Sequence, residues 1–432
     1  MQQTKSQDRF HIDSLGEAKL ENPIPFPPEH RFETQRLLFR PTIEEAKAKK
    51  HPESFEIAAP SEKIFFSPQR SKAAIVTCGG LCPGINSVIR ALVMQLWYRY
   101  QVKNIVGVRY GYQGFRLDAP DPFLVLDPQS VVNIHEQGGS YLGSSRGSPA
   151  ASEIVDTLES ANINMLYIIG GDGTIRGALD VYRQVQKRKL KIAVVAIPKT
   201  IDNDIPFVYR SFGFETAVAL ATNAAYSGHV EAKGIAKGVG LVKLMGRNSG
   251  YIAANATLAL GHANFCLIPE VDFSLEGENG LLRLLEKRFE VSDHALIIVA
   301  EGAGQKYFQG KNLEFDASGN RKLGDIGVFL KEKINTHLRK KGIASAVKYI
   351  DPSYLIRSSR ANPADNLLCA NLAQSAVHGA MAGKTGLLVG VWHGEMTYVP
   401  LAALEKETQS IHPQGDLWFK VLEMTGQPAR IG

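Results

Sequence analysis

The sequence has little cysteine. Four of its 432 residues are cysteines, namely Cys78, Cys82, Cys266 and Cys369. That number is too small for the disulfide framework that stabilises small secreted proteins. Cys78 and Cys82 bracket a glycine turn, but no second cysteine pair or histidine cluster completes a zinc site. We therefore expect four reduced thiols.

Long apolar runs, charge blocks and repeats are also absent. No run reaches the roughly 18 apolar residues that a membrane span needs, and the first residues, MQQTKSQDRFHIDSLGEAK, contain no apolar signal core. The formal net charge of +6 is spread along the chain, which argues little for nucleic acid. There is no low-complexity segment and no short repeat. We expect a cytoplasmic protein that binds neither membranes nor nucleic acid.

The composition is that of an ordinary globular protein. Hydrophobic residues make up 44% and charged residues 21%, and the length allows two domains. Residues 1–70 are rich in proline and charge and cannot bury a core of their own; only residues 42–50 have helical character. We expect this segment to be an arm laid over the main body or over a neighbouring subunit. A partly disordered leader is the alternative.

The most informative stretch is residues 164–204. Its residues 165–169 are typical of a buried strand and 175–187 of a helix, with GGDGT at 170–174 between them. Glycines at a strand-to-helix turn let backbone N–H groups approach an anion, and the helix N-terminus adds its positive dipole end. This arrangement predicts a phosphate cradle.

A second strand, residues 191–197, ends in PKTIDND at 198–204. Both loops follow the carboxyl ends of strands, where open α/β sheets bind ligands. The cradle has Asp172 beside it, and the neighbouring loop carries Asp202 and Asp204. This set suits phosphoryl transfer from a magnesium-bound donor.

The strand–loop–helix pattern recurs before and after this stretch. Residues 73–78, a glycine turn and a helix at 85–100 form a second predicted cradle. A strand at 102–108 precedes the loop 111–115, which is of the kind that shapes a nucleotide site. The glycine- and serine-rich loop 137–147 carries Arg146, which on its own is typical of a solvated surface arginine.

The second half predicts another parallel α/β domain. Its expected helices are 215–227, 251–260 and 325–340, and its expected strands are 238–244, 265–269, 295–300 and 347–350. We expect residues 351–357 to form a loop and the helix 366–381 to return to the first domain. In the tail past residue 400, Trp418, Phe419 and Leu422 have helical spacing, which indicates packing rather than chemistry.

Together these motifs resemble the phosphofructokinase family. GGDGT alone is a weak signal, since unrelated kinases carry it, but the ordered set is specific and covers residues 71–398. Its members are GGLCPGIN at 79–86, GGSYLGSSRG at 138–147, GGDGT, PKTIDND, MGRNSGY at 245–251, PEVDF at 269–273, AEGAG at 300–304 and YLIR at 354–357. DPSYLIR, AQSAVHGAMAG and the N-terminal segment resemble the long ATP-dependent enzymes of plants, trypanosomatids and some bacteria.

The resemblance implies an α/β fold with two doubly wound parallel-sheet domains and an N-terminal extension (1–70). The implied ATP-binding domain is 71–214 plus about 356–400, the sugar-phosphate domain is 215–355, and 401–432 is a C-terminal tail. The implied reaction transfers the γ-phosphoryl of MgATP to the 1-hydroxyl of fructose 6-phosphate, giving fructose 1,6-bisphosphate, the committing step of glycolysis. A homodimer or homotetramer is implied as well.

Residue roles follow from the same resemblance. Asp202 is the implied general base, because a carboxylate orients the attacking hydroxyl and accepts its proton. Asp172 is the implied Mg²⁺ ligand, with Asp204 as an outer partner. Arg247 and Arg357 offer the fixed fork that phosphate recognition favours. The implied ATP site is Gly80, Arg146, Gly147, Gly171, Asp172, Gly173 and Thr174. The implied sugar-phosphate site is Thr200, Ile201, Asp202, Met245, Gly246, Arg247, Glu301, Tyr354, Leu355, Ile356 and Arg357.

The chain departs from the family in two places. Compact bacterial members have a histidine where this chain has Tyr354, and an arginine near Lys237. A different set is therefore expected to hold the 6-phosphate, with Lys237 or Lys243 as candidates. The same divergence puts control by the usual small effectors in doubt.

The donor signature is mixed. Gly173 is of the ATP type, whereas Lys199 is of the type found in the pyrophosphate-dependent branch, which has aspartate at the position of Gly173. Glycine leaves room for the α-phosphate, and a carboxylate there would repel it. We therefore expect ATP. The alternatives are pyrophosphate as donor, or a catalytically silent regulatory subunit.

Overall fold

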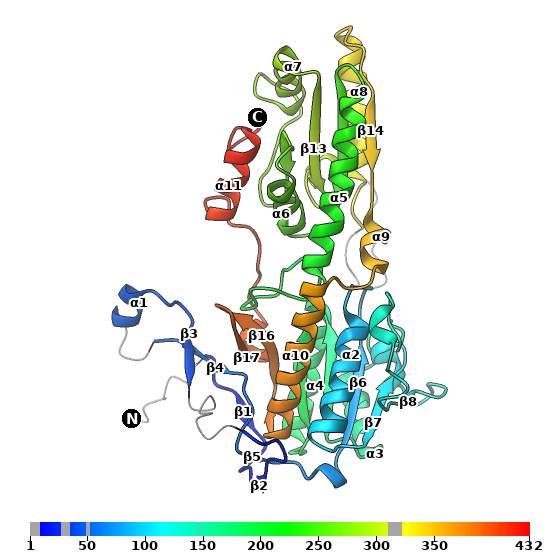
Figure 1. The fold of residues 1–432 in the computed structure, drawn as a ribbon, viewed down its shortest axis with the longest axis vertical. Helices are drawn as coiled ribbons and strands as arrows, with labels where there is room; N and C mark the ends of the chain where they lie inside the picture. The colour runs from blue at the N-terminus through cyan, green and yellow to red at the C-terminus, as the bar shows by residue number, and fades with distance from the viewer. Residues whose placement is uncertain (1–8, 27–34, 49–51, 146, 310–321) are drawn as a thin grey trace. The chain divides into compact units, whose positions relative to one another are not determined.

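The computed structural model describes residues 9–26, 35–48, 52–145, 147–309 and 322–432. These residues form two units, each assembled from several segments of the chain (Figure 1). Unit 1 holds the described residues up to Thr200 together with Ile205–Gly213 and Ser358–Thr408, and unit 2 holds Ile201–Asp204, Phe214–Arg357 and Gln409–Gly432. Within the described ranges, no helix has the length and apolar character to cross a membrane.

Unit 1 is built on a nine-stranded sheet in the order β3-β4-β17-β16-β10-β9-β6-β7-β8. Its centre is parallel and almost entirely buried, which explains the continuous apolar runs in the sequence. Antiparallel strands extend it at both edges. The parallel strands are β6 (Lys72–Thr77), β7 (Asn104–Val108), β9 (Met165–Gly170), β10 (Ala193–Pro198) and β16 (Leu387–Trp392); the antiparallel ones are β3 (Arg36–Leu38), β4 (Ser54–Ile57), β8 (Phe123–Val125) and β17 (Glu395–Pro400).

Helices pack on this sheet in two groups. Alternate strand residues such as Val76 and Ile168 form one core with α3 (Ala151–Ser160) and α4 (Asp172–Lys187). The helix α10 (Pro363–Met381) contacts β10, β16 and α2 (Ile85–Met94). The helix α2 continues into the π-helical turn η3 (Gln95–Arg99). The predicted α/β class is confirmed, although the sheet of unit 1 is mixed rather than purely parallel.

The described N-terminal residues are an integral part of unit 1, which differs from the arm that we expected. β1 (Asp13–Ser14) pairs with β15 (Lys384–Thr385), and β4 pairs with β17. Phe10 and Phe55 are fully buried, with ring centroids 4.3 Å apart. The segment cannot bury a core alone, but its aromatic side chains complete one with Phe207 and Trp392. The short elements around them are β2 (Leu20–Glu21), α1 (Ile43–Ala48), β5 (Lys63–Ile64) and η2 (Pro68–Arg70).

Unit 2 is built on a four-stranded parallel sheet in the order β12-β13-β11-β14. Its strands are β11 (Gly238–Leu244), β12 (Phe265–Leu267), β13 (His294–Ala300) and β14 (Val347–Ile350). The long helix α5 (Phe214–Lys233) packs against α6 (Tyr251–Leu260), while α7 (Leu281–Val291) and α8 (Ile326–Lys340) share a second core with the strands.

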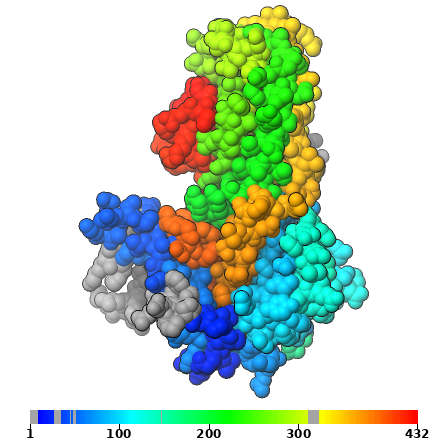
Figure 2. Space-filling model, in the orientation of Figure 1, coloured from blue at the N-terminus to red at the C-terminus, as the bar shows by residue number. Residues whose placement is uncertain are grey.

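One segment of unit 2 differs from the sequence-based expectation, and another agrees with it. Residues expected as the loop 351–357 contain the short helix α9 (Ser353–Ser358). The last residues form α11 (Asp416–Thr425), which packs on α6, contains the buried Trp418 and lies on the surface of unit 2 (Figure 2, red). The tail from Gln409 onward therefore belongs to unit 2.

Candidate active site

The loop between β9 and α4 has little free space at its first two glycines. A Cβ on Gly170 would lie 2.3 Å from Cβ of Thr174, and one on Gly171 would lie 3.3 Å from the carbonyl oxygen of Lys199. Among the described residues, apart from its chain neighbours and the adjacent backbone of α4, no atom lies within 4 Å of the Cβ position of Gly173. Because α4 begins at Asp172, the N–H groups of its first turn and its positive dipole end face this loop. Gly170 and Gly171 serve close packing, whereas Gly173 leaves open space.

Lys199 connects this loop with the turn after β6. Its Nζ donates a hydrogen bond to the carbonyl oxygen of Gly80 at 2.8 Å, and its side chain is buried. The Cβ position of Gly79 lies 3.8 Å from both Lys199 Nζ and Thr174 Oγ1. Since Pro198 lies opposite Gly170 in the sheet, both predicted phosphate cradles and Lys199 converge at one edge of unit 1.

The serine-rich loop 137–147 is hydrogen-bonded to the same edge. Ser144 Oγ donates to the carbonyl oxygen of Gly79 at 2.5 Å, and Thr77 Oγ1 donates to that of Gly143 at 2.7 Å. Gly147 has a φ of +81°, in the left-handed region that favours glycine. Arg146, predicted to contact the donor phosphate, lies outside the described residues.

A hollow of about 300 Å³ follows β7, at the lower end of the size range of small-molecule sites. Its lining includes Arg109, the exposed Tyr110 and Gln113. The adjoining turn η4 (Gly111–Phe115) is tied to α4, because Tyr112 Oη donates to the carbonyl oxygen of Thr174 at 3.0 Å. Sequence analysis singled out 111–115 but missed Arg109 and Tyr110. Their position at the carboxyl end of a predicted strand was the available signal.

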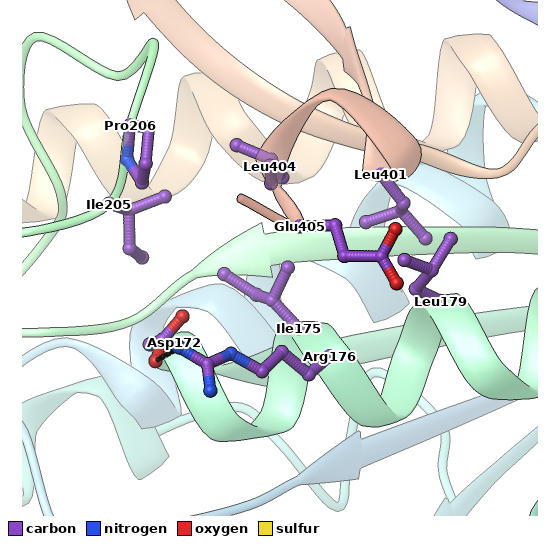
Figure 3. A pocket seen from close by; sticks show the side chains of 9 residues that line it. All are labelled: Asp172, Ile175, Arg176, Leu179, Ile205, Pro206, Leu401, Leu404 and Glu405. Carbon is purple, nitrogen blue, oxygen red and sulfur yellow. Dashed lines mark ion pairs between the residues drawn. The ribbon is translucent and has the colours of Figure 1, made fainter. Parts of the chain in front are cut away.

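The surroundings of Asp172 fit a magnesium ion. Its carboxylate is half exposed and forms an ion pair with Arg176 one turn later, at 2.8 Å. Both residues line an otherwise largely apolar hollow of only about 10 Å³ (Figure 3). In the described part of the chain, no group of three or more His, Cys, Asp or Glu side chains could hold a metal. Mg²⁺ needs no such cage, because it keeps several waters and takes one or two carboxylates together with substrate phosphates.

In unit 2, two loops meet at the carboxyl ends of β11 and β13. The N–H of Glu301 donates to the carbonyl oxygen of Leu244 at 2.8 Å, and that of Gly302 donates to Gly246 at 3.1 Å. A Cβ on Gly302 would lie 1.9 Å from the carbonyl oxygen of Arg247, so only glycine fits there. The predicted sugar residues Met245, Gly246, Arg247 and Glu301 are thus on adjacent loops.

Burial and the neighbouring positive charges shift the pKa of the Glu301 carboxyl in opposite directions. Burial raises the pKa of the Glu301 carboxyl, while the positive charges of Lys243, Arg247 and Arg357 lower it. Lys243 Nζ lies 2.9 Å from Asp351 and 3.2 Å from Asp325. Burial would lower the pKa of Lys243, but the hydrogen bond to Asp351 and nearby negative charges raise it overall. Lys243 therefore stays charged and is already paired with two carboxylates.

The other proposed 6-phosphate residue lies elsewhere. Lys237 precedes the amino end of β11, and its Nζ lies 3.1 Å from Asp293. This position is at the opposite end of the strand from Met245, so the structure does not bring Lys237 to the sugar residues.

On α9 the four YLIR residues differ in exposure. Tyr354 and Leu355 are exposed, whereas the side chain of Ile356 is fully buried. Ile356 therefore contributes packing through its side chain. Arg357 follows it and is close enough to influence Glu301.

The loop carrying Asp202 belongs to unit 2, although sequence analysis placed it in the ATP-binding domain. Ser249 Oγ donates to the carbonyl oxygen of Asp202 at 2.8 Å, and Gln409 Nε2 donates to that of Asn203 at 2.9 Å. The structure thus gathers Ile201 and Asp202 in the same unit as Met245, Arg247 and Glu301, and leaves Thr200 in unit 1. Sequence analysis gave Ser249 and Gln409 no role.

Comparisons with known proteins identify the family of the chain. The model of the Phosphofructokinase family matches residues 72–380. The chain belongs to this family. This phosphofructokinase is 49% identical to the ATP-dependent 6-phosphofructokinase of Borreliella burgdorferi over 97% of both chains. It is 44% identical to that of Amycolatopsis methanolica, over 98% of this chain and 96% of the other, and 42% identical to that of Trypanosoma brucei brucei, over 97% and 88%.

Solved structures show the phosphofructokinase fold. The pyrophosphate-dependent phosphofructokinase of Marinobacter aquaeolei matches with a TM-score of 0.65 at 18% identity, covering 82% of this chain and 91% of the other. Pichia pastoris phosphofructokinase in the T-state matches with a TM-score of 0.62 at 20% identity, covering 84% and 38%. At these identities the likeness shows the fold alone.

Proposed function

We propose that this phosphofructokinase transfers the γ-phosphoryl group of MgATP to the 1-hydroxyl of fructose 6-phosphate, giving fructose 1,6-bisphosphate in the committing step of glycolysis. Relatives that are 42–49% identical over nearly the whole chain are named ATP-dependent 6-phosphofructokinases. The observation that carries the choice of donor is the open space at Gly173.

Gly173 follows Asp172 in the loop where the donor's phosphates pass close to the backbone. With no atom near its Cβ position, the loop leaves room for an α-phosphate and the ribose beyond it. Pyrophosphate remains the second candidate, because Lys199 is of the pyrophosphate type. Lys199 does not decide between the two donors, because a flexible ammonium pairs with whichever phosphate is in reach. In the structure this ammonium donates a hydrogen bond to the carbonyl oxygen of Gly80.

In this proposal unit 1 binds the donor. The N–H groups of Gly171 to Thr174, the turn at Gly80, and Arg146 with Gly147 bind its phosphates. The exposed ring of Tyr110 and the guanidinium of Arg109 suit a purine nucleotide in the hollow after β7. Asp172 would hold the magnesium ion, which neutralises charge on the donor phosphates when bound.

Unit 2 binds the sugar phosphate. Arg247 and Arg357 pair with phosphate oxygens, and Glu301 accepts hydrogen bonds from sugar hydroxyls. Met245 and Gly246 shape the site, together with Ile201, Tyr354 and Leu355. Asp202 orients the 1-hydroxyl and accepts its proton as that oxygen attacks the γ-phosphorus.

A coupled assay with fructose 6-phosphate and either donor tests the proposal. For the wild-type protein, kcat/KM with MgATP should exceed that with pyrophosphate by at least about 10², a difference of about 2.7 kcal/mol in barrier. Turnover with pyrophosphate and none with ATP would contradict it. No turnover with either donor would support a silent subunit.

Asp202→Asn tests the base. The amide is nearly isosteric but cannot accept the proton, so kcat should fall by about 10²–10⁴ with a modest change in KM. Steady-state kinetics with MgATP measure both parameters. A kcat within about threefold of wild type would assign the base to another group.

We also propose that the protein assembles as a homodimer or homotetramer in the cytoplasm. Tyr226 and Val230 are exposed one turn apart on α5, an apolar pair of the kind that subunit contacts cover. The four cysteines are free and buried, which suits a reducing compartment. Light scattering of the purified protein measures the assembly, and a monomer would contradict it.

A further inference from the structure

Two distant side chains hold the backbone of the loop 201–204. Ser249 Oγ donates to the carbonyl oxygen of Asp202, and Gln409 Nε2 donates to the carbonyl oxygen of Asn203, at 2.8 and 2.9 Å. Asn203 is buried and has a φ of +53°, a left-handed conformation that asparagine tolerates but that neighbouring contacts must maintain. Two successive peptide groups beside Asp202 are therefore fixed.

The segment that supplies Gln409 is itself held at three consecutive residues. After Gln409, the carbonyl oxygen of Ser410 accepts a hydrogen bond from Tyr251 Oη at 3.0 Å. The N–H of the buried Ile411 donates to Glu270 Oε1 at 2.9 Å. Burial and the charges of Glu270 and Asp204 raise the pKa of Tyr251 to about 12, so its hydroxyl remains a donor at neutral pH.

Glu270 joins this segment to the loop that supplies Ser249. The same atom, Oε1, also accepts from the N–H of Gly250 at 2.9 Å. A Cβ on Gly250 would lie 2.4 Å from Ile268 Cγ2, so the backbone must approach closely there. One carboxylate oxygen thus sets the spacing between the two segments that bind the catalytic loop.

We propose that Gln409 is a positioning residue for the general base, and that residues 409–411 are a part of the catalytic apparatus rather than packing. This inference rests on the proposed role of Asp202. Gln409 does not contribute to the chemistry itself; its amide holds the peptide that follows Asn203, one residue beyond Asp202. The loop thereby keeps the carboxylate of Asp202 in a productive geometry toward the sugar hydroxyl.

The test variant is Gln409→Leu, which keeps the side-chain volume and removes the donor. Since displacement of a reacting group by about 1 Å can cost about 10²-fold in rate, kcat should fall by about 10-fold or more. The KM values for MgATP and fructose 6-phosphate should stay within about twofold, as expected when only the transition state is affected.

Gln427→Leu is the matched control. Gln427 is a buried glutamine of the tail, whereas Gln409 is half-buried. The amide of Gln427 bonds to both backbone groups of Cys266, at 2.7 and 3.2 Å. This variant should lower the melting temperature and leave kcat unchanged. Equal losses of kcat in both variants would mean that tail packing alone matters, which would overturn the proposal.

A double-mutant cycle with Asp202→Asn gives the decisive readout. If Gln409 acts through Asp202, then Gln409→Leu should change the residual kcat of the Asp202→Asn protein by less than about twofold. A loss of full size in that background, or no loss of kcat in the single variant, would overturn the proposal. If Asp202→Asn itself remained fully active, the assignment of the base would fail instead, and the two failures are thereby distinguished.

Discussion

The hydrogen atom that serves as the side chain of Gly173 leaves space that a carboxylate would fill. We predict that Gly173→Asp lowers kcat/KM with MgATP by about 10²-fold, because the new charge repels the α-phosphate. No atom lies within 4 Å of the Cβ position, so the variant should fold with an unchanged melting temperature. Donor kinetics and thermal unfolding measure the two effects.

Gly170→Ala serves as the contrast. Its Cβ would collide with Thr174, so this variant should lose stability as well as activity. Lys199→Gly in the Gly173→Asp background should restore part of the ATP rate if the two positions interact. That rescue has a limit, since it also removes the buried bond from Lys199 to Gly80. A Gly173→Asp protein with unaltered ATP kinetics would contradict the donor argument.

Glu270 predicts a pH dependence of stability. Burial raises the pKa of its carboxyl above the usual value for glutamate, against three backbone N–H bonds that lower it. Its Oε2 is buried without a hydrogen-bond partner in the described ranges. A raised folded-state pKa means that the folded protein binds the proton more tightly. The linked stability is therefore full below the unfolded-state pKa and is lost as the pH rises through the folded-state pKa.

The substitution Glu270→Gln should remove this dependence of stability on pH. The new amide adds a buried donor, but its cost is the same at every pH. Urea-unfolding midpoints measured from about pH 4 to 7 should therefore fall for wild type relative to the variant as the pH rises. Parallel curves for the two proteins would show that Glu270 has the same pKa in both states.

Sequence analysis placed the glycines and Asp172 correctly at a helix N-terminus, because strand–glycine–helix spacing is a local pattern. It could not predict which lysine lies near the sugar residues. Lys243 is held by Asp325 and Asp351, which are distant in sequence, and Lys237 is at the other end of the same strand. Ion pairs of this kind depend on tertiary packing rather than on local spacing.

At the scale of elements, the largest difference between sequence and structure is the N-terminal segment. β1 and β4 have two and four residues, too few for a periodic pattern, and both pair with strands of the last fifty residues. The helix α3 was also missed, although Ile154, Val155 and Leu158 have helical spacing and are buried. The short N-terminal strands could not be predicted from the sequence, whereas the spacing of the apolar residues in α3 could have identified that helix.

Phe55 on β4 tests the contribution of this segment. It is fully buried among aromatic rings, so Phe55→Ala should cost about 3–5 kcal/mol of unfolding free energy. Phe419 on α11 is 58% exposed, and Phe419→Ala should stay within about 0.5 kcal/mol. Urea unfolding measures both. An equally small effect at Phe55 would mean that the N-terminal strands only cover the unit.

At the scale of the whole molecule, the α/β class, the parallel centre of the sheet in unit 1 and the parallel sheet of unit 2 were predictable from alternating strand and helix patterns. The course of the chain between the units was not. Residues 201–204 and 409–432 belong to unit 2, and the contacts between these two segments include a bond from a side chain to a carbonyl group 206 positions away. No local pattern of sequence encodes such a bond.

The hydrogen bond from Gln409 to Asn203 joins two residues that the ribosome adds at very different times during translation. A ribosome adds Asn203 long before it adds Gln409, since 206 positions separate them, and N-terminal parts of a chain begin to fold as they emerge. A chain that stops short of Gln409 already carries every recognisable motif of the family, yet the peptide that follows Asn203 lacks its bond from Gln409. Prematurely terminated products would therefore turn over fructose 6-phosphate poorly, and completion of the chain would act as a checkpoint before the cell's ATP is committed.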